Sequence, residues 1–187
     1  MADDELKALY PFLHGGSKEA ASEHAALLES VRQKSDHSLR DKQRFFADNS
    51  EALIDAARAV ADVYRNGGHM FSMGNGGSSC DAAHFAVEFQ HPVTAGRPAL
   101  AATNLCVDTA VMTAVGNDIG MAHIFARQLE AHGRAGDGLV GFSTSGNSAN
   151  LMAGLRKGRE LGMRTIGLVG GDGGEMRGSG VLDHCLW

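Results

Sequence analysis

The spacing of apolar residues divides the chain into a helical front and an alternating remainder. Between residues 17 and 65 no run resembles a strand, and apolar positions recur every three or four residues, which predicts two or more helices. Asn49–Ser50 stands before an apolar stretch as a helix cap would, and Gly67–Gly68 would end that helix. We therefore expect a helical N-terminal extension over residues 1–48 and a larger domain over residues 49–187.

From residue 69 onward, short apolar runs alternate with segments of helical periodicity. The expected strands cover about residues 69–73, 98–102, 138–142 and 164–169, and the expected helices cover about 79–90, 109–115, 123–132 and 150–161. Strands that alternate with helices form parallel sheets with right-handed crossovers. The larger domain is therefore expected to be of the α/β class.

Polar loops follow two of the expected strands. Residues 74–79 (GNGGSS) come after the first strand, and residues 143–148 (STSGNS) come after the third. At a strand-to-helix junction, free backbone N–H groups, the helix dipole and side-chain donors converge, and together they favour an anion. Ligands of parallel sheets bind outside the carboxyl ends of the strands. Two such loops at one sheet edge indicate a single ligand that carries a phosphate and several hydroxyls.

The first loop does not fit the common nucleotide-binding motifs. A dinucleotide-binding loop has the pattern G-x-G-x-x-G, and here Ser79 stands where the third glycine would be. The second expected strand carries no acidic residue at its end, where residues 99–103 read ALAAT. A Walker loop is also absent, because neither Gly-Lys-Ser nor Gly-Lys-Thr occurs in the sequence. Nucleotide binding is therefore disfavoured.

Composition narrows the class of protein further. With 187 residues, 43% of them hydrophobic, the chain can bury a core without disulfides or metals as staples. Its three cysteines form no C-x-x-C pair, which favours a reducing, cytoplasmic location. The start of the chain is acidic where a signal peptide would be basic, and no apolar run approaches the roughly 20 residues that span a bilayer. A net charge of −5 argues against direct nucleic-acid binding.

Three blocks of sequence carry a resemblance to a known family. Residues 74–88 (GNGGSSCDAAHFAVE), 115–118 (VGND) and 143–150 (STSGNSAN) resemble, in order, the sugar-isomerase (SIS) domain and its phosphoheptose isomerase branch. The resemblance implies a three-layer fold, with a five-stranded parallel sheet flanked by helices and a helical N-terminal region. It also implies a homotetramer with active sites at subunit interfaces, and a reaction that converts sedoheptulose 7-phosphate to D-glycero-D-manno-heptose 7-phosphate.

The same resemblance assigns roles to individual residues. His84 and Glu88 match a catalytic pair that also binds zinc. The other matched positions are those that line the substrate (Asn75, Gly76, Gly77, Ser78), those that contact it (Asn117, Asp118) and those that hold its phosphate (Ser143, Thr144, Ser145, Ser148). In the family, a late helix adds a glutamine and a second histidine. The printed sequence ends at Trp187, so the last strand and that helix are expected to be missing.

The residues themselves support part of this assignment. His84 and Glu88 are four positions apart on one expected helix, so both side chains project from the same face. Aldose–ketose isomerisation needs a base near the reacting carbon and a group that polarises the carbonyl oxygen, and a carboxylate beside an imidazole can supply both. Taken alone, the pair would be an ordinary surface pair, and Ser148 would be an ordinary helix cap.

A non-catalytic function stays open at this point. SIS domains also serve as sugar-phosphate sensors, and one related branch binds the bacterial replication initiator. That branch lacks the glutamate and carries an arginine in the phosphate loop, whereas this sequence has Glu88 and Ser145 at the matching positions. The sequence therefore favours the isomerase. The basic residue that the family carries after the glutamate-bearing helix has no clear counterpart at residues 90–93.

Overall fold

The computed structural model describes residues 20–94 and 96–187, with side chains from residue 22 onward. The chain forms two compact units, residues 1–48 and 49–187. Within the first unit, the described residues are all helical and belong to α3 (Ala20–Arg65), which runs on into the second unit without a break. The prediction of two or more helices in this region is therefore wrong for the described residues.

Asn49 explains why the expected helix boundary does not exist. Its side chain is buried, and its Nδ2 donates a hydrogen bond of 2.8 Å to the backbone oxygen of Trp187, while its Oδ1 accepts from the Trp187 N–H at 3.4 Å. The amide thus binds the far end of the domain and caps no helix. A polar residue that finds such a partner can stay inside a helix, and its sequence pattern cannot be told from a cap.

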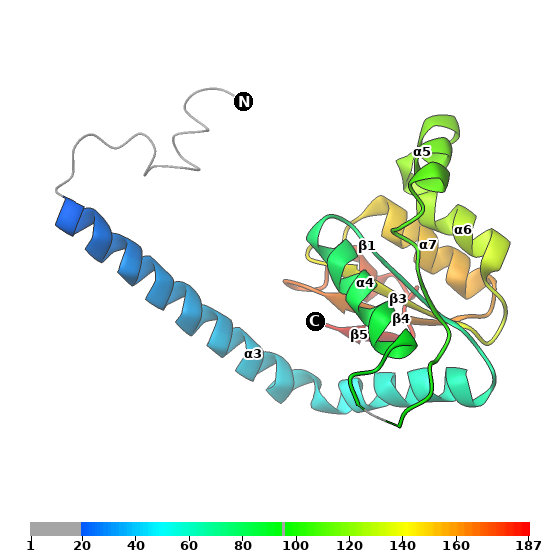
Figure 1. The fold of residues 1–187 in the computed structure, drawn as a ribbon, viewed down its shortest axis with the longest axis horizontal. Coiled ribbons are helices and arrows are strands. Elements are labelled where there is room, and N and C mark those ends of the chain that lie inside the picture. Colours follow the sequence, from blue (N-terminus) through cyan, green and yellow to red (C-terminus); the bar gives the residue numbers. More distant parts are fainter. Residues whose placement is uncertain (1–19, 95) are drawn as a thin grey trace. The chain divides into compact units, whose positions relative to one another are not determined.

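The second unit is built on a five-stranded sheet in which every pair of neighbours is parallel. The strand order is β2-β1-β3-β4-β5 (Figure 1). The strands are β1 (Met70–Gly74), β2 (Ala102–Asn104), β3 (Gly138–Ser143), β4 (Arg164–Val169) and β5 (His184–Leu186). The expectation that the last strand is missing is therefore wrong, because β5 pairs with β4.

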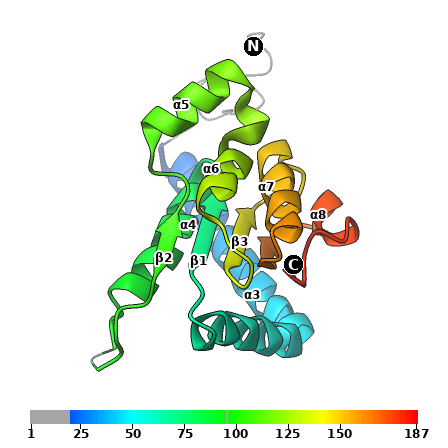
Figure 2. The same cartoon turned by 90° about the vertical axis from the view of Figure 1, so that its right-hand side faces the viewer.

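Helices cover both faces of this sheet, as Figures 1 and 2 show. One face packs against the second half of α3 and against α4 (Gly77–Gln90). The other face carries α6 (Ile124–His132) and α7 (Ala149–Glu160), whose apolar residues fill the main core together with Phe71, Met73 and Leu139. The remaining helices are α5 (Thr109–Asp118), η1 (Met121–His123) and α8 (Gly174–Gly178). The α/β sandwich expected from the sequence is confirmed.

Strand β2 lies several residues later in the chain than predicted. The expected run began at Pro98, which has no N–H to donate to a sheet ladder. In the structure, the Leu100 N–H donates to the Phe89 oxygen at 2.9 Å, so this stretch is bound to the end of α4 instead. The parallel ladder begins at Ala102, opposite Met70. Polar Thr103 and Asn104 lie within β2, which the apolar pattern could not indicate.

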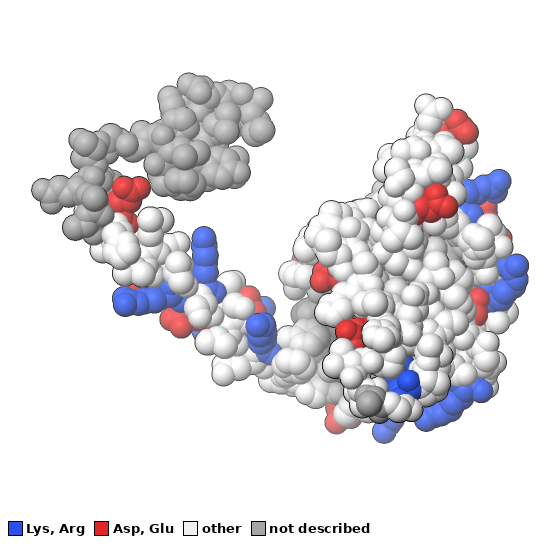
Figure 3. Space-filling view, viewed as in Figure 1, with Lys and Arg blue, Asp and Glu red and all other residues white. Residues whose placement is uncertain are grey.

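Charge is distributed unevenly over the second unit. In the view of Figure 3, Lys and Arg side chains gather along its rim, and most of the face toward the viewer is uncharged. The described part of the first unit carries both signs along its helix. Among the described residues, no helix combines the length and the apolar character that a bilayer-spanning helix requires.

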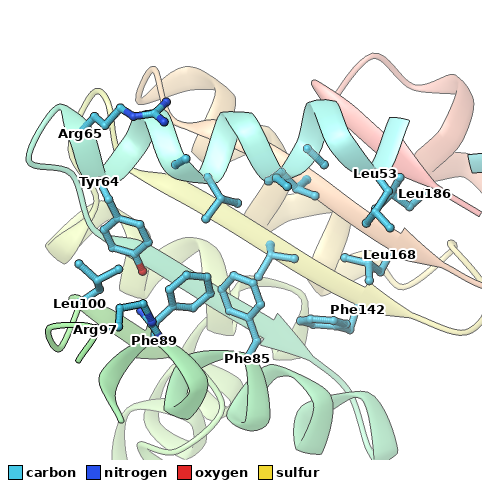
Figure 4. A pocket seen from close by; sticks show the side chains of 16 residues that line it. Leu53, Tyr64, Arg65, Phe85, Phe89, Arg97, Leu100, Phe142, Leu168 and Leu186 are labelled. Carbon is cyan, nitrogen blue, oxygen red and sulfur yellow. The ribbon is translucent and has the colours of Figure 1, made fainter. Parts of the chain in front are cut away.

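An apolar groove of about 750 Å³ lies within the second unit, between α3 and α4 and over strands β3, β4 and β5. Figure 4 shows Phe85 and Phe89 of α4 on one side of this groove and Leu53 of α3 on the other, with Phe142 and Leu168 on its floor. Burial in this region raises the pKa of Tyr64 to about 12. The groove contains none of the residues that the sequence predicts for the substrate or its phosphate.

The junction between β1 and α4 predicts a large difference between two glycine substitutions. A Cβ on Gly74 would lie 2.2 Å from the backbone oxygen of Ser78, whereas a Cβ on Gly77 would meet no atom within 4 Å. We expect Gly74→Ala to lower the free energy of unfolding by about 1–3 kcal/mol or more, because the backbone at Ser78 would have to move to make room for the methyl group. Gly77→Ala should change it by less than about 1 kcal/mol, with stabilisation favoured. Urea unfolding of both variants measures this, and equal destabilisation would contradict the close contact.

Candidate active site

The order of the strands determines where a site can form. From β1 the chain passes through α4 to β2 on one side, and from β3 it passes through α7 to β4 on the other. The two connections therefore leave neighbouring strands in opposite directions, which is the arrangement where parallel sheets bind ligands. The register pairs Gly74 with Phe142, so the loops that follow β1 and β3 begin side by side.

The first loop, Asn75–Gly76, opens directly into α4. Gly76 has a φ of 53°, in the region that favours glycine, and no side chain caps the helix that follows. The donors of the first turn of α4 are thus not used by a capping side chain, which suits an anion or a sugar hydroxyl. Asn75, Gly76 and Gly77 are exposed, while Ser78 is buried. Of the four residues predicted to line a substrate, three therefore face solvent.

The second loop is shaped by its own serines. Ser143 is buried, and its Oγ accepts a hydrogen bond from the Gly146 N–H at 3.0 Å. The Oγ of Ser145 accepts from the Asn147 N–H at 3.3 Å. Among the described residues, the hydroxyls of Thr144 and Ser148 have no such partner, and Ser148 precedes α7 without capping it. Two hydroxyls thus stabilise the turn of this loop, and the other two have no partner among the described residues.

The segment that follows β4, residues 170–176, packs against the second loop. The Asn147 Oδ1 accepts from the Glu175 N–H at 2.8 Å, and the Gly146 oxygen accepts from the Met176 N–H at 3.0 Å. The two loops approach so closely that a Cβ on Gly146 would lie 2.1 Å from the Gly173 oxygen. Glycines in both loops therefore permit a close backbone contact between residues 143–148 and residues 172–174.

His84 and Glu88 lie together on α4, as the spacing predicts. His84 Nε2 and Glu88 Oε1 are 3.2 Å apart, and the two side chains are 73% and 45% exposed. By the helical rise, His84 lies about 10 Å and Glu88 about 16 Å beyond Gly77 along the axis, although helical side chains lean back toward the N-terminus. The α4 residue between them in sequence order, Phe85, has its ring centre 6.1 Å from that of Phe142, the residue before the second loop, so this part of α4 lies over the end of β3.

Asn117 and Asp118 lie at the end of α5, which projects from the rest of the domain in Figures 1 and 2. The Asn117 Nδ2 donates to the Asp118 Oδ1 at 2.8 Å, and both residues are exposed. Among the described residues, no hydrogen bond or ion pair connects them to either loop or to His84 and Glu88. Their role as substrate contacts therefore stays a prediction from the resemblance.

Three comparisons with known proteins bear on this geometry. The model of the SIS domain family matches residues 35–170. The phosphoheptose isomerase of Chlorobaculum parvum is 42% identical over 151 residues, which cover 80% of this chain and 72% of that protein, and the enzyme of Desulfovibrio desulfuricans is 44% identical over 147 residues, covering 79% and 69%. The chain belongs to the phosphoheptose isomerase branch of the SIS-domain family.

Solved structures of the family agree with this membership. The structure of phosphoheptose isomerase GmhA from Neisseria gonorrhoeae superposes with a TM-score of 0.79 at 41% identity, covering 86% of this chain and 84% of that one. A phosphoheptose isomerase from Francisella tularensis gives a TM-score of 0.81 at 33% identity, covering 85% and 84%. The chain is thus an isomerase of this family, and the comparisons favour this interpretation over the sensor alternative.

Sequence reasoning missed two polar residues of the site. Asn150 is part of the block that carries the resemblance, yet it received no role, and Cys106 received none either. The Asn150 and Asn75 amides exchange two hydrogen bonds, and the Cys106 thiol donates to the Gly74 oxygen at 3.2 Å. Burial raises the pKa of the Cys106 thiol. Asn150 is the second residue of α7, directly after the polar loop 143–148, and that position could have indicated a role. Nothing in the sequence singles out Cys106.

The first Lys or Arg after α4 is Arg97, which stands beyond residues 90–93. Arg97 lies further along the same connection, donates to the Glu88 backbone oxygen and places its guanidinium 5.6 Å from the centre of the Phe89 ring. It lines the apolar groove of Figure 4. Its charge therefore lies behind α4, on the groove side.

Proposed function

We propose that this protein interconverts sedoheptulose 7-phosphate and D-glycero-D-manno-heptose 7-phosphate. The observation that carries the proposal is the pair of polar loops at neighbouring strand ends, in a chain of the phosphoheptose isomerase branch. One loop offers backbone and amide donors, which suit sugar hydroxyls. The other offers hydroxyls at an uncapped helix N-terminus, which suit a phosphate.

In this proposal, the second loop binds the phosphate. The hydroxyls of Thr144 and Ser148 and the first turn of α7 point donors at the dianion, and Ser143 and Ser145 keep the loop in shape while their O–H groups remain able to donate. Asn75 and the glycines after it line the sugar. Asn117 and Asp118 contact the substrate, as the resemblance implies.

Glu88 serves as the base in the proposed reaction. Its carboxylate takes a proton from C1 of the ketose, the electron pair forms the enediol, and the proton returns to C2 as the carbonyl re-forms at C1. A hydroxyl proton passes from O1 to O2 in the same interconversion, so no other reactant is needed. His84, 3.2 Å from Glu88, stabilises the charge that develops on the oxygens.

The role of Glu88 predicts a separation of binding from turnover. Glu88→Gln keeps the size of the side chain but cannot accept the carbon-bound proton, so we expect kcat in the full-length protein to fall by about 10²-fold or more with little change in substrate affinity. Asp41→Asn is the matched control, because His37 and Asp41 form a similar pair 3.1 Å apart on α3. Kinetics and calorimetry provide the measurements. Wild-type turnover in Glu88→Gln would remove Glu88 as the base and favour the sensor function.

We also propose that His84 and Glu88 supply two of the ligands of a zinc ion. An imidazole nitrogen and a carboxylate oxygen are both ordinary zinc ligands. Catalytic zinc sites use three protein ligands, however, and the described residues contain no group of three His, Cys, Asp or Glu side chains that could hold a metal. Because the described residues do not complete a zinc site, we assign no step of the reaction to zinc.

The zinc proposal can be tested without an activity assay. Calorimetric titration of the full-length protein with zinc should give a site whose affinity falls at least tenfold in His84→Ala. Removing a residue that only hydrogen-bonds to a metal ligand already lowers metal affinity by about tenfold or more, and removing the ligand itself lowers it further. His37→Ala provides the control, because His37 also has an acidic neighbour four residues later, Asp41, and lies on α3. Equal losses in the two variants, or no zinc binding by the wild type, would contradict the proposal.

We propose further that the protein is a homotetramer whose sites are shared between subunits. The described part of the first unit exposes several large apolar side chains to between 44% and 65%, which a second copy could bury: Leu27, Leu28, Val31, Leu39 and Phe46. An isolated helix gains little stability in water without such packing.

Shared sites predict complementation between two inactive variants. Glu88→Gln lacks the base, and Ser148→Ala lacks a phosphate ligand. If the base of one subunit serves the phosphate loop of another, co-expressed variants should form mixed tetramers that regain part of the wild-type activity. Light scattering measures the oligomer, and a stable monomer at micromolar concentration would contradict the tetramer. Mixed tetramers without activity would place each site within one subunit.

The remaining expectations concern the surroundings of the protein. We propose that it acts in the cytoplasm, as its three unpaired cysteines favour. We also propose that it does not bind nucleic acid directly. The net charge of −5 and the scattered Lys and Arg side chains support this second proposal.

A further inference from the structure

The two loops of the candidate site are joined by a pair of asparagine side chains. Asn75 is the first residue after β1, and Asn150 is the second residue of α7. The Asn75 Nδ2 donates to the Asn150 Oδ1 at 2.8 Å, and the Asn150 Nδ2 donates to the Asn75 Oδ1 at 2.8 Å. The two residues are 75 positions apart in the sequence, so this contact exists only because β1 and β3 are neighbours.

A backbone group fixes the orientation of this pair. The Asn150 Oδ1 also accepts from the Leu151 N–H at 3.0 Å, and a backbone N–H can only donate. The oxygen of the Asn150 amide must therefore lie on that side, and so the nitrogen of the Asn75 amide must face it. The orientation of Asn75 is thus set by the N-terminal turn of α7.

The pair leaves Asn75 with unused hydrogen-bonding capacity. A side-chain amide has two N–H donors and two lone pairs on its oxygen, and the contact with Asn150 uses one of each. Asn75 is exposed, so its second N–H and its second lone pair are accessible to a ligand. Asn150 is half-buried, and its oxygen already accepts two hydrogen bonds.

We propose that Asn150 is a positioning residue that orients the Asn75 amide toward the sugar. It also holds the first loop (residues 74–79), which lines the sugar, at a fixed distance from the second loop (residues 143–148), which binds the phosphate. This inference rests on the proposed function, and it assigns Asn150 an action through Asn75 alone. The residue touches neither the phosphate nor the reacting carbons. Its loss allows the Asn75 amide to rotate and the gap between the loops to vary, so the correct alignment of a seven-carbon phosphosugar is lost.

A double-mutant cycle tests this action. The variants are Asn150→Ala, Asn75→Ala and the double variant in the full-length protein. We expect Asn150→Ala to lower kcat/KM for sedoheptulose 7-phosphate about tenfold or more, because small misplacements are costly. The double variant should be no worse than Asn75→Ala, since Asn150 has nothing left to orient. Melting temperatures should change little, because Asn75 is exposed and Asn150 is only half-buried.

Inhibition by inorganic phosphate separates this role from a merely structural one. The phosphate inhibition constant should be unchanged in Asn150→Ala. Asn147→Ala is the matched comparison, because the Asn147 side chain supports the phosphate loop through the Glu175 N–H and makes no hydrogen bond to Asn75. It should weaken phosphate inhibition and should add to the effect of Asn75→Ala. Asn66→Ala is a neutral control, since Asn66 binds the Asp62 oxygen at the end of α3.

The outcomes distinguish this inference from the proposed function. Additive effects of Asn75→Ala and Asn150→Ala, or weakened phosphate inhibition in Asn150→Ala, would overturn the positioning role. A wild-type protein that binds sedoheptulose 7-phosphate without converting it would overturn the proposed reaction. In that case, the same cycle measured as calorimetric affinity for the sugar phosphate still decides the role of Asn150.

Discussion

The pairing of β1 with β3 is the constraint on which the rest of the site depends. Because β2 lies on the other side of β1, the chain must cross the sheet before it forms β3, and the connections after β1 and β3 then diverge. The divergence opens space between two helix N-termini. It also places Asn75 within hydrogen-bonding distance of Asn150. A different strand order would keep both sequence motifs and separate them in space.

The absence of side chains at a few positions makes this arrangement compact. At Gly74, α4 turns back onto the end of its own strand, and at Gly146 the phosphate-type loop lies against the backbone of Gly173. The loops that follow β3 and β4 are thereby packed backbone to backbone, and the loop after β1 contacts α7 through the Asn75 and Asn150 side chains. Serine hydroxyls and asparagine amides in these loops accept hydrogen bonds from backbone N–H groups of the same or the neighbouring loop. These bonds make the loops rigid although much of their surface is exposed.

The sequence predicted those parts of the structure whose signal is local. Strand β4 was placed at its observed bounds, and both polar loops were found, because apolar runs that end in Gly, Ser and Asn are local patterns. Long-range contacts produced the failures. Asn49 has the sequence pattern of a helix cap, but its side chain binds the backbone of Trp187. Asn150 contacts Asn75 only because β1 pairs with β3, and no local sequence pattern indicates that pairing. The resemblance supplied the roles of Asn117 and Asp118, and the described contacts do not yet connect them to the site.

The two faces of α4 connect the apolar groove with the proposed chemistry. Phe85 and Phe89 line the groove, while His84 and Glu88, each one position earlier, lie on the neighbouring row of the helix and are exposed to solvent. An enediol must be kept from water and from stray protons, and the described residues leave this pair open. Neighbouring rows of one helix are covered together, because a packed element spans more than one row. A partner that covered the groove would therefore also lie beside His84 and Glu88, so it would bury the apolar face and exclude water from this pair at the same time.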